Sequence, residues 1–276
     1  MRLTTRTKTY DLSERTHIMG ILNVTPDSFS DGGRYFSLER AIEQAVEMER
    51  DGADFIDIGG ESTRPGHDPV SSEEEANRIV PVIEAVRSRI NIPISIDTYK
   101  ADTARKAIDA GADIINDIWG GKKDPEMVTV AANKRVPIVL MHNRTDMHYR
   151  SLIDDMKQDL QASIDLAMEG GVTKENIVLD PGIGFAKTGD HNLMVMNNLE
   201  QFAALGYPVL LGTSRKGFIG KILHLPADER DNGTGATTCL GITKGAQIVR
   251  VHNVKVNVEL AKMMDAMLRK GADMNG

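Results

Sequence analysis

The chain has 276 residues, of which 41% are hydrophobic and 26% are charged, and its formal net charge at pH 7 is −7. A chain of this length can bury most of its surface in one core and is close to the size of a (β/α)8 barrel, so we expect a single domain over residues 1–276. The negative charge, without a block of like charges, argues against nucleic acid or an anionic membrane as a partner.

The amino-terminal segment 1–16 alternates polar and apolar residues, which predicts a β-hairpin that covers the amino-terminal end of the barrel. It lacks the apolar region of a signal peptide, and no stretch of the chain is apolar enough to span a membrane. The single cysteine, Cys239, cannot form a disulfide within the chain. We therefore expect a cytoplasmic protein.

Eight short apolar runs predict β-strands, and each run ends in polar residues. Those that begin at Gly52, Gly111 and Gly245 follow helix-like segments and resemble one another, which indicates a helix-to-strand unit that is used repeatedly. Near-continuous apolar strands are typical of a parallel sheet that is covered on both faces. The runs are 17–23, 52–60, 93–97, 111–121, 137–143, 176–182, 208–216 and 245–253.

Amphipathic segments between these strands predict helices over 38–50, 72–88 and 151–169, and further helices are expected to start near Asp124 and Asn253. In the second segment, Ser72 and Glu75 have the spacing of a capping box. Eight strand and helix units favour a closed (β/α)8 TIM barrel over the alternative, an open doubly wound sheet.

Active sites of such barrels lie where the carboxyl ends of the strands meet, so the polar residues at these ends are candidates for function. Each one alone is explained as a cap or turn residue, but eight sets around one mouth indicate a binding site. The strand ends supply Asn23, Glu61 to Arg64, Asp97, Asn116 and Asp117, Met141 to Asn143, Asp180, Ser214 to Lys216, and Arg250 to His252.

The side chains of these residues divide into two sets, each suited to a different kind of ligand. One group combines hydrogen-bond acceptors and donors that suit the edges of a flat heterocycle. The other, Arg250 and His252 just before a helix start, indicates an anion site, with an ion pair between Arg250 and one of the aspartates as the alternative. The members of the first group are Asp97, Asn116, Asp180 and Lys216.

Other motifs are missing. Ser214 does not lie in a nucleophile elbow, and the chain contains no phosphate-binding P-loop sequence. His142 and His148 lack the spacing of zinc ligands and are expected to be packing or loop residues.

Seven motifs, in order over residues 19–254, resemble the motif series of the dihydropteroate synthases. That family has the barrel fold and condenses 7,8-dihydropterin-6-ylmethyl diphosphate with 4-aminobenzoate, which gives 7,8-dihydropteroate for folate synthesis and releases diphosphate. The resemblance thus implies a transferase, a sulfonamide target and a homodimer. The motifs are GILNVTPDSFSDGG from Gly20, DIGGESTRPG from Asp57, SIDTYK from Ser95, INDIWGG from Ile115, DPGIGFAKT from Asp180, GTSRKGFIG from Gly212 and RVHNV from Arg250.

The resemblance also implies roles for single residues. It places the pterin against Asp97, Asn116, Asp180 and Lys216, with Met141 and Arg250 flanking the ring. It places the diphosphate at Asn23, Arg250 and His252, with Mg²⁺ bridging the leaving group and the Asn23 side chain. It places 4-aminobenzoate beneath two loops that contain Phe29, Asp31, Thr63, Arg64 and Pro65, with Phe185 and Lys216 on the opposite side.

The implied reaction is a magnesium-assisted, SN1-like substitution in which diphosphate departs before the weakly nucleophilic amine attacks. No strong general base is required. The residues expected to act on the reaction are Asn23, Asp97, Lys216, Arg250 and His252.

Two other functions are alternatives to this reaction. A pterin-dependent methyltransferase does not need the SFSDGG, TRPG and RVH motifs together, and a non-catalytic pterin-binding paralogue need not keep Asn23, Arg250 and His252. The chain departs from the family pattern at three positions: Ala186 replaces a frequent glycine, Gly217 a larger residue and Asn253 a frequent aspartate.

Overall fold

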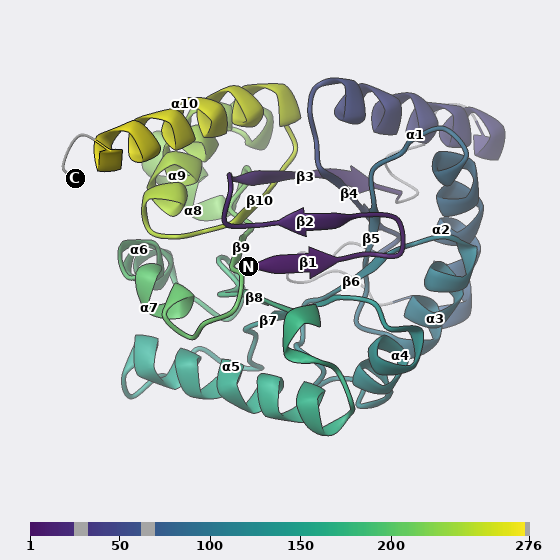
Figure 1. The fold of residues 1–276 in the computed structure, drawn as a ribbon, viewed down its shortest axis with the longest axis horizontal. Coiled ribbons are helices and arrows are strands. Elements are labelled where there is room, and N and C mark those ends of the chain that lie inside the picture. The colour runs from purple at the N-terminus through teal and green to yellow at the C-terminus, as the bar shows by residue number, and fades with distance from the viewer. Residues whose placement is uncertain (25–32, 62–69, 274–276) are drawn as a thin grey trace.

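The computed structural model describes residues 1–24, 33–61 and 70–273. Eight parallel strands form a barrel with helices around its outside (Figure 1), so the predicted (β/α)8 fold is confirmed. The strands are β3 (His17–Asn23), β4 (Phe55–Gly59), β5 (Ile94–Asp97), β6 (Ile114–Asp117), β7 (Ile138–Met141), β8 (Ile177–Asp180), β9 (Leu210–Leu211) and β10 (Ile248–Val251). Their order is β8-β7-β6-β5-β4-β3-β10-β9, and a parallel bridge between Leu179 and Val209 joins the two ends.

Helices follow the strands in the predicted alternation. The expected segments correspond to α1, α2 and α5, and the two expected helix starts correspond to α4 and α10. No helix in the described part of the chain is long and apolar enough to cross a bilayer. The helices are α1 (Gly33–Arg50), α2 (Ser72–Arg87), α3 (Ala101–Ala110), α4 (Glu126–Lys134), α5 (Leu152–Glu169), η2 (Lys174–Asn176), α6 (Gly189–Asn197), α7 (Glu200–Ala203), α8 (Gly217–Leu223), η3 (Ala227–Glu229), α9 (Asp231–Thr243) and α10 (Val254–Asp273).

The start of α2 differs from the prediction by one residue. Ser71 is the N-cap, because its backbone is extended and its hydroxyl accepts a hydrogen bond from the Glu74 amide. Glu75 is buried and pairs with Lys100 at 2.8 Å. The predicted capping box of Ser72 and Glu75 is therefore wrong, since the carboxylate of Glu75 contacts a neighbouring unit of the barrel instead.

The predicted amino-terminal hairpin is present and lies across the bottom of the barrel (Figure 1). Its strands, β1 (Arg2–Thr4) and β2 (Thr9–Asp11), pair in antiparallel register. Leu3, Tyr10 and Leu12 pack in one buried cluster with the first residues of the barrel strands, such as Phe55 and Ile248. The hairpin closes this end of the barrel, and the polar strand ends lie at the opposite mouth.

Candidate active site at the mouth of the barrel

A row of residues crosses four neighbouring strands at the mouth. Asn23 on β3 is in register with Gly59 on β4, Gly59 with Asp97 on β5, and Asp97 with Asn116 on β6. The polar members of this row come from widely separated parts of the sequence. The parallel register thus brings together Asn23, Asp97 and Asn116, as predicted.

Arg250 on β10 forms two ion pairs inside this mouth. Its Nε lies 2.6 Å from Oδ2 of Asp57, and its Nη2 lies 2.8 Å from Oδ2 of Asp97. The Asn116 amide donates to the same Asp57 oxygen at 3.0 Å. The alternative expectation, an ion pair between Arg250 and an aspartate, is therefore present, and it uses two of the five N–H donors of the guanidinium.

Asp57 was not predicted as a site residue. Its side chain is fully buried in β4 between apolar neighbours. A carboxylate in an apolar strand is costly unless it has a partner, so its position within the strand was the available signal. The partner could not be identified from the sequence, because Arg250 is 193 residues away.

Burial perturbs the acidic groups of the mouth. It raises the pKa of Asp97 to about 7, while the charge of Arg250 opposes the shift. Oδ1 of Asp97 and Oδ1 of Asp57 are buried and have no hydrogen-bond partner among the described residues. Because buried acceptors are normally satisfied, these two oxygens are suited to a ligand that presents N–H groups.

Lys216 and Asp180 come from the other strands of the barrel. Asp180 ends β8, and Lys216 lies between β9 and α8. Burial lowers the pKa of Lys216 to about 8, and the charge of Asp180 opposes this shift. The Lys216 ammonium donates to the carbonyl of Ile183 and lies 4.7 Å from the centre of the Phe185 ring. The predicted neighbours Lys216 and Phe185 therefore do meet.

Asp180 ends β8 beside Met141, its partner in register on β7. Its Oδ1 accepts a hydrogen bond of 2.7 Å from the Gly182 amide, and burial raises its pKa. Met141 is 2% exposed, so it is packed at the strand end where the sequence predicted it.

His252 is held by Ser214. The Ser214 hydroxyl lies 2.9 Å from Nδ1 of His252 and accepts a hydrogen bond of 3.1 Å from its backbone N–H. Since that oxygen accepts from the backbone, its proton can be donated to Nδ1, which places the proton of a neutral imidazole on Nε2. A cavity of about 520 Å³ lies between α1 and the ends of β3 and β10, and its lining includes Asn23, Arg215 and His252.

Two of the three sequence departures have structural consequences. Ala186 has a φ of 47°, in the left-handed region that favours glycine. Asn253 donates to Oδ2 of Asp231 at 2.8 Å, and the same carboxylate binds Arg215 through both of its oxygens. An aspartate at position 253 would meet Asp231 as a like charge. A Cβ added at Gly217 would have no described atom within 4 Å.

Five residues predicted for the 4-aminobenzoate subsite lie outside the described residues. They are Phe29, Asp31, Thr63, Arg64 and Pro65.

Comparisons with known proteins show which family the chain is similar to. The family model for pterin binding enzymes matches residues 19–252. Dihydropteroate synthase of Bacillus subtilis is 60% identical over 99% of this chain and 95% of its own length.

Two solved structures have the same fold. Dihydropteroate synthase of Clostridium difficile, solved in the presence of pteroic acid, has a TM-score of 0.92 and 50% identity, over 94% of this chain and 98% of that one. The Xanthomonas albilineans enzyme, solved with 4-aminobenzoic acid, has a TM-score of 0.92 and 38% identity, over 97% and 98% of the two chains. On these grounds the chain belongs to the dihydropteroate synthases, a family of transferases within the pterin-binding enzymes.

Proposed function

We propose that this chain condenses 7,8-dihydropterin-6-ylmethyl diphosphate with 4-aminobenzoate, giving 7,8-dihydropteroate and diphosphate. The observation that supports this most is the position of Arg250. Its guanidinium contacts Asp57 and Asp97, which offer unsatisfied oxygens to a heterocycle, and its strand leads directly to His252. The residues proposed to bind the ring therefore lie next to the residue proposed to bind the leaving group.

The pterin would be read by the buried acceptors and donors of the mouth. Asp97 and Asp180 offer carboxylate oxygens to ring and amino N–H groups, while Asn116 and Lys216 offer donors to the carbonyl and a ring nitrogen. Arg250 and Met141 would lie against the ring. Each polar group here is costly when buried without a partner, so a matching heterocycle is favoured over water and over apolar rings.

The diphosphate would be bound at the ends of β3 and β10. His252 would donate from Nε2, its Nδ1 being held by Ser214, and Arg250 and the N-terminus of α10 would add positive potential. These groups act most strongly when negative charge accumulates on the departing oxygen, so they would stabilise the transition state more than the bound substrate.

The residues present fit a magnesium ion that takes most of its ligands from the substrate. Asn23 offers an amide oxygen at the exposed end of β3, on the wall of the cavity that His252 also lines. The described residues include no group of three or more His, Cys, Asp or Glu side chains placed to hold a metal. Asn23 would be the one protein ligand, and Mg²⁺, when bound, would neutralise charge on the leaving diphosphate.

The 4-aminobenzoate ring would pack against Phe185 and the alkyl part of Lys216. Gly217 puts no side chain next to Lys216, and a Cβ added there would have no described atom within 4 Å. Residues Phe29, Asp31, Thr63, Arg64 and Pro65 are proposed to complete this subsite. The amine is neutral and needs no strong base before it attacks.

Departure of diphosphate would leave positive charge on the pterin methylene, delocalised into the ring. Asp97 and Asp180 would stabilise that charge, because they are buried and would lie beside the ring, where Coulomb interactions are weakly screened. This favours an SN1-like path. Asp97, Lys216, Arg250, His252 and Asn23 are thus the residues proposed to act on the reaction.

A direct assay tests the proposal. Purified protein with both substrates and Mg²⁺ should form 7,8-dihydropteroate and diphosphate in equal amounts, and EDTA should stop the reaction. Asp180→Asn should weaken binding of 6-hydroxymethyl-7,8-dihydropterin by at least tenfold in calorimetry, since a buried charged partner is worth on the order of 2–5 kcal/mol.

Pterin calorimetry and a second assay, with methyltetrahydrofolate and a corrinoid, separate the alternatives. Pterin binding without product would identify a non-catalytic paralogue. Methyl transfer from methyltetrahydrofolate to a corrinoid, without pteroate formation, would identify a methyltransferase.

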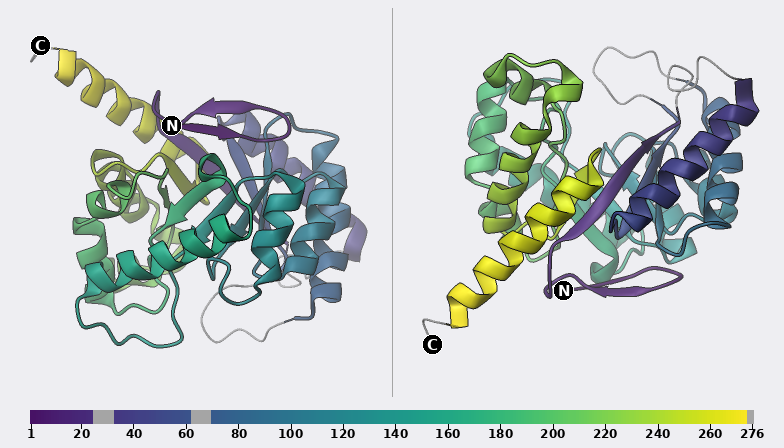
Figure 2. Two further views of the ribbon diagram at one scale, coloured as in Figure 1. Left: turned by 60° about the horizontal axis from the view of Figure 1, so that its bottom comes forward. Right: turned by 90° about the horizontal axis from the view of Figure 1, so that it is seen from above.

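We also propose that the chain acts in the cytoplasm as a homodimer that associates through α10. Figure 2 shows α10 extending away from the barrel, and Val256, Met263 and Met267 are 37%, 59% and 49% exposed along it. Their spacing of seven and four residues places them on one face. Met263→Glu should give a monomer in light scattering, whereas Met168→Glu, at a similarly exposed methionine of α5, should leave the dimer intact. A wild-type monomer would exclude the dimer.

A further inference from the structure

Lys187 is a buried lysine that does not belong to the set described above. It follows β8 and is 8% exposed. Its Nζ lies 2.9 Å from the carbonyl oxygens of Gly182 and Phe185 and 2.9 Å from Nδ1 of His142. All three contacts of this ammonium are to neutral acceptors, and two of them lie in its own loop.

The tautomer of His142 determines how these contacts share hydrogens. Nε2 of His142 lies 3.0 Å from the carboxylate of Asp159, which also binds Arg144. A carboxylate only accepts, so Nε2 has the proton and Nδ1 is an acceptor. Burial lowers the pKa of His142 to about 4, in agreement with a neutral ring. In its ammonium form, Lys187 donates three hydrogens to these three acceptors, which uses every N–H of the group. Burial lowers the pKa of Lys187 to about 7, and the charge of Asp180 opposes this shift.

The segment that Lys187 closes has an unusual backbone. Gly182, Gly184 and Ala186 have φ values of 66°, 88° and 47°. A Cβ at Gly182 would lie 2.0 Å from the carbonyl oxygen of His142, so the segment is pressed against the end of β7. Such a conformation persists only where the surroundings fix it.

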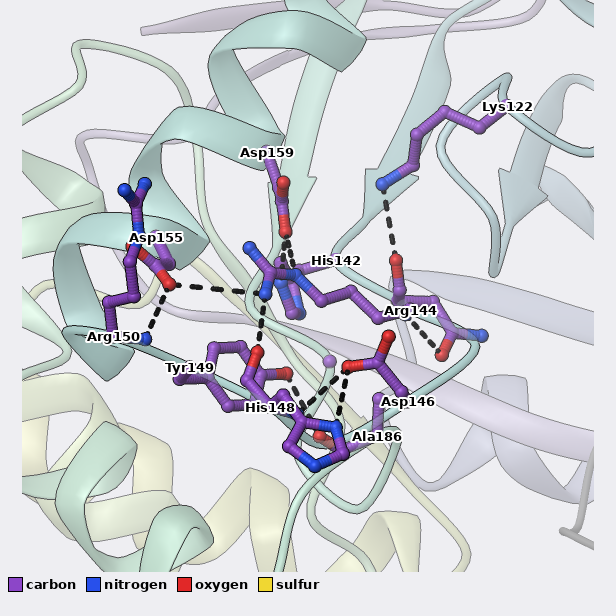
Figure 3. A network of polar contacts seen from close by, with 12 residues as sticks. Lys122, His142, Arg144, Asp146, His148, Tyr149, Arg150, Asp155, Asp159 and Ala186 are labelled. Carbon is purple, nitrogen blue, oxygen red and sulfur yellow. Dashed lines mark hydrogen bonds and ion pairs between the residues drawn. The ribbon is translucent and has the colours of Figure 1, made fainter.

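A second contact fixes the same segment from the loop after β7. The Tyr149 hydroxyl donates to the carbonyl oxygen of Ala186 at 2.9 Å (Figure 3). Figure 3 also shows His142 beneath Asp159 and Arg144, within the network that holds this loop. Segment 182–187 is therefore attached to the residues after β7 at two adjacent positions, at Ala186 by Tyr149 and at Lys187 by His142. The contacts of Lys187 with the Gly182 and Phe185 carbonyls extend this attachment to the rest of the segment.

Segment 182–187 forms the part of the site wall that contacts Lys216. Phe185 lies under the Lys216 ammonium, and the Ile183 carbonyl accepts a hydrogen bond from that same ammonium. We infer that Lys187 is a positioning residue for the 4-aminobenzoate subsite, because it holds segment 182–187 in the conformation that places Phe185 against Lys216. The inference rests on the proposed function, which assigns Phe185 to that subsite.

Lys187→Met tests this, since methionine has a similar length but donates no hydrogen bond. The KM for 4-aminobenzoate should rise about ten- to hundredfold, the range expected for misplacement of a binding group by about 1 Å. The affinity for 6-hydroxymethyl-7,8-dihydropterin should fall by a clearly smaller factor. Asp97, Asn116 and Arg250 lie on other strands, whereas Asp180 and Lys216 of the proposed pterin set contact segment 182–187. Lys134→Met, which removes a lysine from the exposed ion pair with Asp109, should change neither value.

Tyr149→Phe is the milder companion variant. It removes one hydrogen bond to the same segment and leaves Lys187 in place, so it should raise the same KM by a smaller factor. If Lys187→Met does not fold, Tyr149→Phe becomes the test of whether fixing this segment matters. An unchanged KM for 4-aminobenzoate in Tyr149→Phe would then overturn the inference.

Two results with Lys187→Met would overturn it as well. One is an unchanged KM for 4-aminobenzoate. The other is a loss of pterin affinity equal to the rise in KM, which would mean a general structural role. Absence of product from the wild-type protein would instead contradict the proposed function, so the two failures are distinguishable.

Discussion

Arg250 on β10 reaches Asp97 on β5, with 2.8 Å between Nη2 and Oδ2, although β3 and β4 lie between the two strands. The same guanidinium binds Asp57 on β4 at 2.6 Å. One cation therefore compensates two buried carboxylates. Replacement of Arg250 should therefore lower the stability of the fold, because it leaves the buried carboxyl groups of Asp57 and Asp97 without a compensating charge.

Arg250→Met should for this reason lower the free energy of unfolding by about 3–5 kcal/mol, measured by urea denaturation at pH 7. Arg15→Met is a matched control, because Arg15 is about half exposed and pairs with Asp54 at the opposite end of the barrel. The control should lose much less. A loss below about 1 kcal/mol for Arg250→Met would show that the ion pairs contribute little to stability.

Asp97 should make stability depend on pH. Its pKa is raised from 3.8 to about 7 by burial, so between these values the folded state binds a proton that the unfolded state has released. Folding is therefore disfavoured as pH rises through this window. The free energy of unfolding of the wild type, relative to Asp97→Asn, should fall from pH 4 to pH 7 in urea titrations. A difference that is constant with pH would contradict the raised pKa.

The sequence was sufficient to predict the barrel and the strand-end set, because both follow from local patterns. Asn23, Asp97, Asn116 and Asp180 end apolar runs, and in a parallel barrel such ends necessarily converge. The convergence of these strand ends could therefore be predicted without knowing any contact between them.

Residues whose role depends on a distant partner were not predictable in this way. His142 was expected only to pack, and its contact with Lys187 joins positions 45 apart in the sequence. The position of Asp57 in an apolar strand indicates that it has a partner, but the sequence does not identify that partner as Arg250. The N-cap of α2 was misplaced for a related reason, since Glu75 is engaged by Lys100 rather than by its own helix end.

Ala186→Gly should stabilise the protein. The φ of 47° places alanine in the left-handed region, which costs about 1–2 kcal/mol, and glycine loses part of that gain through its freedom in the unfolded chain. The expected net increase in the free energy of unfolding is about 0.5–1 kcal/mol. Ala204→Gly, at a position with a φ of −66°, should have the opposite effect. A destabilised Ala186→Gly would mean that the methyl group is needed for packing.

Substitution of His252 tests whether leaving-group activation and ring recognition depend on different residues. His252→Ala removes a donor that matters most as diphosphate gains charge, so kcat should fall by roughly 10- to 1000-fold, as for loss of one preorganised donor. Affinity for 6-hydroxymethyl-7,8-dihydropterin should hardly change, because that ligand lacks the diphosphate. Ser214→Ala should lower kcat less, since it removes the hydroxyl that orients the imidazole and leaves the imidazole itself. Equal losses of turnover, pterin affinity and thermal stability in His252→Ala would instead indicate a residue that only supports the fold.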